Sequence, residues 1–263
     1  MSSLPLVSNP DASEMTWYRK MASILDIFFR NTDILLHDGE TSCQATKDSR
    51  NINSRLCEDA DNKNSFVGRK IDLLLNSVSV DISSSEWKKA NVSVATGEQQ
   101  QAKNCRTNSA ILHQLLDSHV KNINLPTTFV VGMDLIGGCG YMLGIKSVDG
   151  AHIAYHLGDL VLPSSLACLQ DFKDILDLLY AFKKYQLMLK AIIESAYHRK
   201  QAAGTLGHYR EVDLPDDIKI PETLFSPQQQ QVAHTKKSII SAGAYVNLVI
   251  QAMSESTGLS KKV

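Results

Sequence analysis

The N-terminal part of the chain carries apolar residues at helical spacing. This pattern predicts a helix over residues 14–31, with Ser13 as its N-cap. The preceding residues 1–13 are rich in Ser, Pro and Asn and are expected to form a disordered leader. One face of the predicted helix should be buried, and it consists of Trp17, Met21, Ile24, Leu25 and Phe28.

Two strands and a second helix are predicted after a polar stretch. Residues 70–75 and 80–88 predict strands that pair through a turn at 76–79. A helix is expected from about 98 to 120. Its apolar stripe would contain Ala102, Cys105, Ile111, Leu112, Leu115 and Leu116.

Strand-like segments dominate the chain after Pro126. Residues 127–133, 139–147 and 152–157 are rich in β-branched and aromatic side chains, and Gly137-Gly138 and Asp149-Gly150 are turn signals between them. A long helix is then expected from Ser164 or Ser165 to about His198. Its apolar side, which includes Phe172, Leu176, Leu179 and Ile192, should be buried.

These elements predict an α/β (or α+β) fold, with a mixed sheet and flanking helices. Residues 14–163 would form the core, with a polar mobile insertion near 37–65. Residues 164–263 would form a C-terminal helical extension packed on that core.

Composition narrows the functional classes. The 263 residues carry a formal net charge of −1, so any nucleic-acid binding requires a local basic surface. Five scattered cysteines form no CxxC pair, which argues against a zinc ribbon or a thioredoxin-type site. No secretory signal and no apolar run of membrane-spanning length is visible. We therefore expect a soluble, intracellular protein, either nuclear or cytoplasmic.

Three charged residues lie within the two central predicted strands. Asp72 lies within the apolar run of the first strand, and Glu86 and Lys88 lie two positions apart near the end of the second. Alternate residues of a strand project to one face, so Glu86 and Lys88 should point the same way, with Asp72 close by. Two carboxylates beside an ammonium group are suited to a hard divalent cation and an anionic substrate.

The order of these residues resembles the Asp…Glu-x-Lys motif of the PD-(D/E)XK nuclease superfamily. The resemblance covers about residues 14–135, in which a helix, the Asp strand, the Glu-x-Lys strand and a further helix follow one another. Two departures are Ile71, where the family often has proline, and the polar stretch before the Asp strand, where it usually has another strand.

The resemblance implies a function and a cofactor. Asp72 and Glu86 would bind Mg²⁺ or Mn²⁺, with the carbonyl of Trp87 as a further ligand, and Lys88 would orient water or offset negative charge. The supporting residues in the next helix would be Gln99, Gln100 and Lys103. Asp33 or Glu40 is a possible third carboxylate. The activity would be metal-dependent phosphodiester hydrolysis, unless the chain is an inactive relative of that fold.

The whole chain also resembles a protein family of early-diverging, Mucorales-type fungi, from which no function carries over. This resemblance rests on GRKIDLLL, SEWKK, QQQAKNCRTN and the Gly140-Tyr141 segment.

Two alternatives remain open from the sequence. The chain is either a nuclease or a non-enzymatic scaffold that binds a protein partner, or a second copy of itself, through its C-terminal helices. The basic pair Arg69 and Lys70 is either a solvated strand entry or a phosphate clamp.

Overall fold

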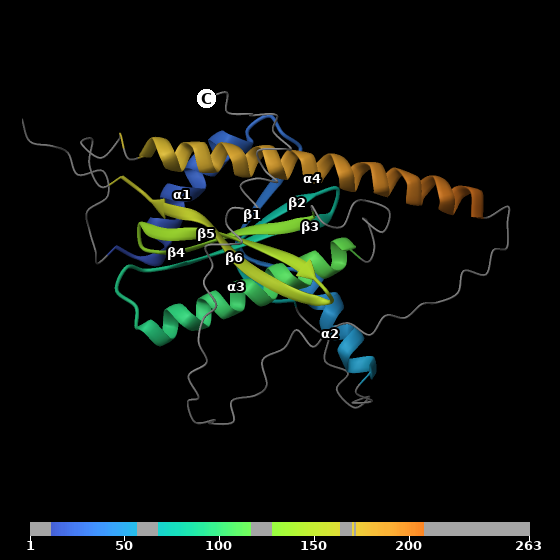
Figure 1. Cartoon of the computed structure of the whole chain (residues 1–263), viewed down its shortest axis with the longest axis horizontal. Coiled ribbons are helices and arrows are strands. Elements are labelled where there is room, and N and C mark those ends of the chain that lie inside the picture. The colour runs from blue at the N-terminus through green and yellow to red at the C-terminus, as the bar shows by residue number, and fades with distance from the viewer. Residues whose placement is uncertain (1–11, 57–67, 117–127, 164–169, 171, 208–263) are drawn as a thin grey trace, which may run out of the picture.

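The computed structural model describes residues 12–56, 68–116, 128–163, 170 and 172–207 (Figure 1). The predicted leader up to residue 11 and the C-terminal part from 208 to 263 lie outside these residues. The elements in chain order are α1 (Glu14–Phe29), β1 (Leu35–Ser42), α2 (Gln44–Leu56), β2 (Lys70–Ser77), β3 (Val80–Lys88), α3 (Val94–Gln114), β4 (Phe129–Ile136), β5 (Cys139–Val148), β6 (Ala151–Val161) and α4 (Phe172–Gly207).

The described strands form one six-stranded mixed sheet in the order β1-β2-β3-β4-β5-β6. Neighbouring strands are antiparallel except for β3 and β4, which are parallel. A parallel pair needs a crossover, and α3 provides it. The predicted α/β class is therefore confirmed, with helices flanking a mixed sheet.

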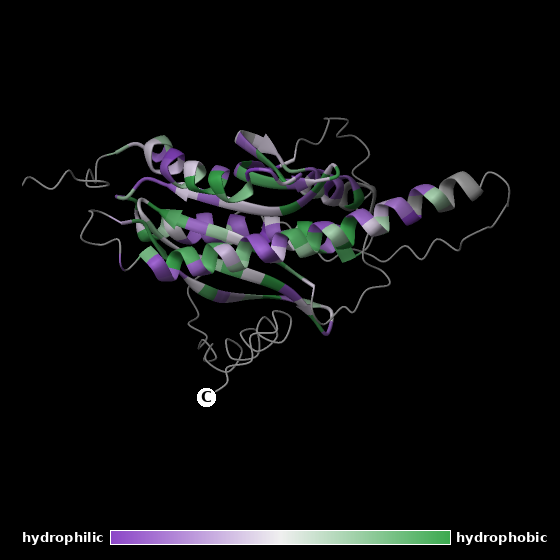
Figure 2. Cartoon of the chain, turned by 90° about the horizontal axis from the view of Figure 1, so that it is seen from above, coloured by the Kyte–Doolittle hydropathy of each residue, from purple (hydrophilic) through white to green (hydrophobic). Residues whose placement is uncertain are grey.

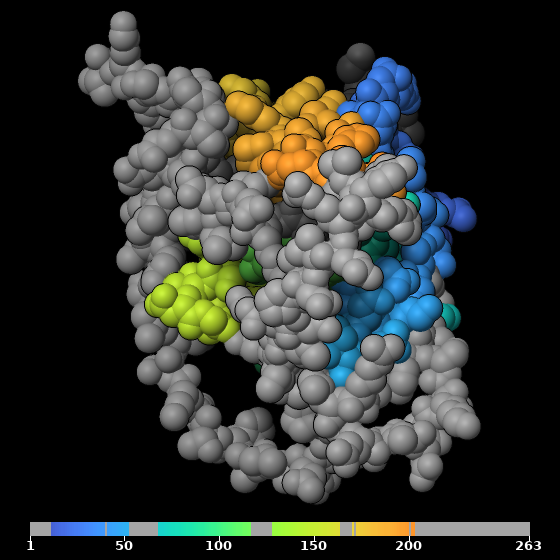
Figure 3. All heavy atoms as spheres, turned by 90° about the vertical axis from the view of Figure 1, so that its right-hand side faces the viewer, coloured from blue at the N-terminus to red at the C-terminus, as the bar shows by residue number. Residues whose placement is uncertain are grey.

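The helices cover the sheet in two layers. α1 and α4 lie on one face, and α2 and α3 lie on the other (Figure 1). A side view shows the end of α4 at the top of the molecule and α2 below it (Figure 3). Both α1 and α4 alternate hydrophobic and hydrophilic residues, as expected of helices with one buried side (Figure 2).

The start of the first helix and the three turns that join β2 to β3, β4 to β5 and β5 to β6 form where the sequence predicts them. Ser13 caps α1, because its hydroxyl accepts a hydrogen bond from the amide of Thr16. Asp149 and Gly150 both have positive φ, as the tight turn between β5 and β6 requires. Val78 and Ser79 also have positive φ in the turn between β2 and β3, although neither is a glycine.

The polar stretch near 37–65 contains regular structure where it is described. β1 and α2 occupy most of residues 35–56, so the prediction of a loop there is wrong. The start of α2 is stabilised from a distance: the carboxylate of Asp81 on β3 accepts hydrogen bonds from the amides of Gln44 and Ala45, at 2.8 and 3.2 Å. Small polar residues of α2 itself, such as Thr46 and Ser49, are buried. Residues 57–65 lie outside the described part.

The long C-terminal helix begins and ends later than predicted. Among the residues expected to be buried, Leu179 is fully buried, whereas Phe172, Leu176 and Ile192 are only partly so. Phe182 contacts Phe29 of α1, with ring centroids 5.8 Å apart. α4 therefore shares its hydrophobic core with the sheet over the residues described.

Candidate active site

The two strands that carry the candidate residues separate at the site. β2 pairs with β3 as far as Leu73 opposite Ser85, and the next residue of β3, Glu86, pairs instead with Asp134 of β4. β3 thus changes its hydrogen-bonding partner between Ser85 and Glu86. Glu86 and Asp134 lie near the carboxyl ends of the parallel strands β3 and β4, and ligands of open α/β sheets commonly bind outside the carboxyl ends of such strands.

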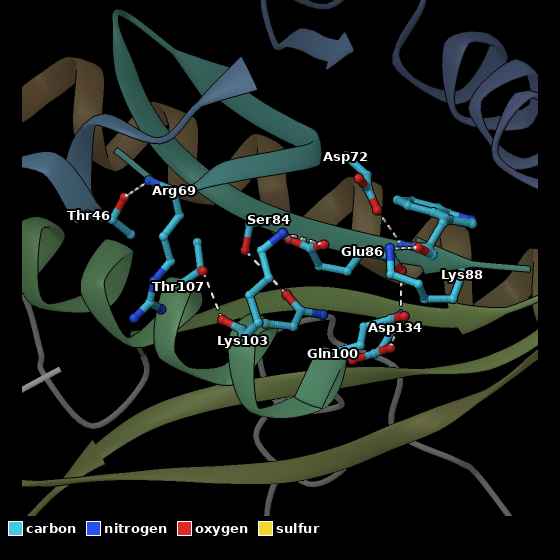
Figure 4. A network of polar contacts seen from close by, with 12 residues as sticks. Thr46, Arg69, Asp72, Ser84, Glu86, Lys88, Gln100, Lys103, Thr107 and Asp134 are labelled. Atoms are coloured by element: carbon cyan, nitrogen blue, oxygen red, sulfur yellow. Dashed lines mark hydrogen bonds and ion pairs between the residues drawn. The ribbon is translucent and has the colours of Figure 1, made fainter. Parts of the chain in front are cut away.

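Asp72 occupies the point of separation. One of its carboxylate oxygens accepts a hydrogen bond from the backbone amide of Trp87 at 2.7 Å (Figure 4). This bond satisfies a backbone amide of β3 just beyond the point where the pairing of β2 with β3 ends. The side chain of Asp72 therefore holds the two strands together while remaining only partly buried.

Glu86 is the most deeply buried of the three predicted residues. Its side chain is 1% exposed, and the ammonium nitrogen of Lys103 lies 2.8 and 2.9 Å from its two carboxylate oxygens. Burial, followed by repulsion from Asp72, raises the pKa of Glu86 to about 7, although Lys103 and Lys88 act in the opposite direction. When no metal ion is bound, the Glu86 carboxyl group therefore changes between its protonated and ionised forms near neutral pH.

Lys88 turns away from Glu86 toward the opposite layer. Its ammonium group donates to Glu14 of α1 at 3.0 Å and to the carbonyl oxygen of Trp87 at 2.8 Å. Burial lowers the pKa of Lys88, but the Glu14 hydrogen bond and the charges of Asp72, Glu14 and Glu86 outweigh it, so that the pKa is raised overall. Lys88 is thus a cation within electrostatic reach of both candidate carboxylates. Its ammonium group nevertheless pairs with Glu14 of α1, whereas Glu86 pairs with Lys103 of α3, so the prediction that Glu86 and Lys88 point the same way is wrong for their charged ends.

Asp134 is a third carboxylate that sequence reasoning missed. It lies beside Glu86 on β4 and is 4% exposed, and its Oδ2 atom has no hydrogen-bond partner among the described residues. Burial raises the pKa of Asp134 to about 6, although Gln100, Asn104 and Lys88 lower it. The signal was an Asp inside the apolar run FVVGMDLI, the same kind of signal that identified Asp72.

Only part of the predicted supporting set reaches the site. Gln100 is buried and donates to the backbone carbonyls of Glu86 and Leu135 and to the carboxylate of Asp134. Lys103 pairs with Glu86 as described above. Gln99 is exposed on α3, so its predicted supporting role is not borne out by its position.

The buried side of α3 is polar rather than apolar in its first half. Gln100, Asn104 and Asn108 recur four residues apart and are all buried. Asn108 accepts a hydrogen bond from the amide of Ser84 at 2.9 Å and donates to its carbonyl at 3.0 Å. Its amide therefore replaces a neighbouring strand at this point of β3. Of the predicted stripe, Ile111, Leu112 and Leu115 are fully buried, and Cys105 and Leu116 are partly buried against the core.

The oxygen atoms at the site are suited to a hard cation that is bound weakly and keeps part of its water, rather than to one that the protein surrounds completely. Asp72, Glu86 and the Trp87 carbonyl offer oxygen atoms, and repulsion between the two carboxylates favours a cation near them. However, no group of three or more His, Cys, Asp or Glu in the described residues is arranged to hold a metal ion. Of the other carboxylates considered, Asp33 pairs with Lys190 at 2.7 Å. Mg²⁺ commonly keeps several waters and takes only one or two carboxylates, which this set can provide.

Comparisons with known proteins add no relative. No family model, curated protein or solved structure matches the chain. The resemblances to the PD-(D/E)XK superfamily and to the fungal family remain predictions from sequence. No helix in the described ranges is long and apolar enough to cross a membrane.

Proposed function

We propose that the protein hydrolyses phosphodiester bonds in nucleic acid, with a divalent cation bound by Asp72 and Glu86. The observation that carries this proposal is the position of Asp72, Glu86 and Lys88 where β2 and β3 separate. It is strengthened by the element order α1-β1-β2-β3-α3-β4, in which β1 supplies the strand that the resemblance requires before the Asp strand.

The side chains have distinct roles in this proposal. Asp72 and Glu86 would hold Mg²⁺ or Mn²⁺, which polarises a phosphoryl oxygen and lowers the pKa of a bound water. Lys88 stays protonated and offsets negative charge that develops on the phosphate or orients the attacking water. Gln100 fixes the backbone carbonyl of Glu86, and Lys103 neutralises Glu86 before a cation arrives.

A specific observation favours a second candidate, an inactive relative that acts as a scaffold. Each of the three residues already has a partner within the chain. Asp72 accepts from the Trp87 amide, Glu86 pairs with Lys103, and Lys88 pairs with Glu14. Such a network can serve the fold alone, in which case the protein would bind a partner without cutting anything.

Nuclease assays separate the two candidates. Full-length protein with Mg²⁺ or Mn²⁺ should cut at least one of single- or double-stranded DNA or RNA, and chelation should stop the reaction. Glu86→Gln keeps the shape but removes a ligand charge, so it should lose about 100-fold or more in rate. Lys88→Ala should lose rate while Mn²⁺ binding, followed by relaxation or calorimetry, persists.

Matched controls lie close to each substitution. Lys89→Ala and Glu98→Gln change exposed residues next to Lys88 and on α3, and both should cut at the wild-type rate. Mn²⁺ binding should fall in the Asp72→Ala/Glu86→Ala double variant. If no substrate is cut with either metal, or Glu86→Gln cuts as fast as wild type, the scaffold candidate replaces the nuclease.

A further inference from the structure

A row of side chains leads from the candidate carboxylates across the sheet. Glu86 of β3 lies opposite Asp134 of β4, and Asp134 lies opposite Tyr141 of β5. Tyr141 in turn lies opposite Asp159 of β6. Residues opposite one another on neighbouring strands project to the same face of a sheet, so these side chains share the face on which α3 packs. Neighbouring strands are about 4.8 Å apart, which places Tyr141 about 10 Å from Glu86 along the row.

A β-bulge in β6 brings a histidine onto the same face. The pairing of β5 with β6 shifts between Met142 and Leu143, which leaves Leu157 of β6 without an opposite residue. His156 and Asp159 are three positions apart but project to one face, because their partners on β5 are two residues apart. The Nε2 atom of His156 lies 2.9 Å from the Oδ1 atom of Asp159, within hydrogen-bonding distance. Bulges of this kind often redirect side chains next to functional sites.

Tyr141 and His156 form a pair of aromatic rings in this row, here called the aromatic pair. Their ring centroids are 5.9 Å apart, and the angle between the ring planes is 41°. Burial, followed by the charges of Asp134 and Cys105, raises the pKa of Tyr141, so its phenol stays neutral. The hydrogen bond to Asp159 orients the imidazole of His156. Both rings are therefore held in position by groups of the protein itself.

Exposure increases along the row from β3 to β6. Glu86 and Asp134 are 1% and 4% exposed, and Tyr141 is half-buried. The side chain of His156 is 47% exposed, and that of Asp159 is 79% exposed. The aromatic pair thus lies where a row that begins with buried carboxyl groups reaches the surface of the molecule.

Partly exposed aromatic rings beside a phosphodiester site are suited to a nucleobase. Tyrosine and histidine rings stack on the bases of single-stranded nucleic acids with little regard to sequence. A base within a duplex already stacks on its neighbours, so it is not available to such rings. Asp159 at the outer end of the row repels a phosphate group but not an uncharged base. The chemistry of this surface therefore favours the base of an unpaired nucleotide.

We propose that Tyr141 and His156 stack on an unpaired base of the nucleic-acid substrate, next to the phosphodiester bond held at Asp72 and Glu86. This assignment rests on the proposed function for its class of ligand. It goes further in naming single-stranded nucleic acid as the form that is bound. The recognised group is a base, so the experiment must also distinguish a polynucleotide from a free nucleotide.

Oligonucleotide binding measured without catalysis tests the aromatic pair directly. Full-length protein in EDTA is titrated into two labelled single strands of about 15 nucleotides, one with bases and one with abasic sites throughout, and anisotropy is followed. The two strands carry the same number of phosphates, so they differ only in stacking. Tyr141→Leu and His156→Ala should each weaken binding of the strand with bases about fivefold or more. Neither substitution should change binding of the abasic strand.

Three controls separate stacking from packing and from charge. Tyr141→Phe keeps the ring and should bind both strands as wild type does. Tyr180→Leu removes a tyrosine that is 61% exposed on α4, on the opposite face of the sheet, and should also bind as wild type does. The dependence of binding on KCl concentration should be the same in all variants, because stacking releases no counterions. Thermal melting checks that each variant is folded, and His156→Ala changes an exposed side chain and should melt as wild type does.

The outcomes separate this inference from the proposed function. Ring-dependent binding of the strand with bases, without cleavage of any substrate, supports the stacking site and sinks the nuclease. Cleavage by wild type, together with unchanged binding in folded Tyr141→Leu and His156→Ala, overturns the stacking site and leaves the nuclease standing. The assignment is also overturned if wild type binds the two strands equally or binds neither, or if adenosine monophosphate at an equal concentration of bases displaces the strand.

Discussion

The face of the sheet under α1 and α4 is packed with aromatic and aliphatic side chains, whereas the face under α3 is packed with amides, hydroxyls and carboxyls. On the first face, Trp87 meets Tyr18 edge to face, with ring centroids 5.3 Å apart. On the second, the side chain of Asn108 hydrogen-bonds both backbone groups of Ser84 in β3, and Gln100 donates to the backbone carbonyl of Glu86.

The difference indicates that one face of the sheet mainly stabilises the fold, whereas the other depends on specific hydrogen bonds. Apolar contacts are non-directional, so the α1–α4 face supplies stability and constrains its residues mainly by size. The side-chain amides of Gln100, Asn104 and Asn108 on the α3 face have specific partners, and removing one of them leaves another group buried and unsatisfied. Glu86 and Asp134 are buried on this polar face, where their pKa values are raised. Perturbed carboxyls are common at functional sites, so chemistry is expected on this face.

The largest effect should come from opening a cavity in the apolar face. Leu179→Ala removes a fully buried side chain of α4 and should lower the free energy of unfolding by about 2–5 kcal/mol. Denaturant titration measures this loss. Met188→Ala on the same helix removes a side chain that is 41% exposed and is the control. Equal losses in the two variants would show that α4 does not anchor this face.

The second effect is a pH dependence that belongs to the polar face alone. The pKa of Glu86 is raised from 4.5 to about 7, so the folded state holds a proton that the unfolded state releases. Stability that is present below about pH 4.5 should therefore fall as pH rises, by about 3 kcal/mol near pH 7. Glu86→Gln cannot ionise and should lack this part of the decline.

The measurement is a comparison of unfolding free energies in EDTA at several pH values. The difference between wild type and Glu86→Gln isolates this one group, because the other titrating groups are common to both. Parallel curves between pH 4.5 and 8 would mean that Lys103 compensates fully for the burial of the Glu86 carboxylate.

The contrast between the faces also explains what the sequence could predict. Ser13 before an apolar stripe and Asp149-Gly150 between two strands are local signals, and both produced the predicted structure. The helical spacing of apolar residues in α1 likewise predicted which side of that helix is buried. Asp72, Glu86 and Lys88 lie at short spacing on adjacent strands, so the sequence could place them near one another, but it could not predict that Lys88 turns to Glu14 of α1.

The missed features depend on residues that are distant in sequence. The carboxylate that caps α2 comes from Asp81, 37 positions after Gln44, so no local cap marks the helix. Asp134 reaches Glu86 only because α3 returns the chain to the parallel partner of β3. The polar stripe of α3 was misread because buried amides are expected only when their partners are known.

The smallest effect should come from the amide that replaces a strand on the polar face. Asn108→Ala leaves the amide and carbonyl of Ser84 without their side-chain partner and should cost about 1–3 kcal/mol. Hydrogen exchange followed by NMR should show faster exchange of the Ser84 amide than in wild type. Gln101→Ala changes an exposed residue of the same helix and should leave that rate unchanged. A Ser84 amide that stays equally protected in Asn108→Ala would mean that the neighbouring β4 backbone closes over it, and the polar face would then be held by its strands rather than by α3.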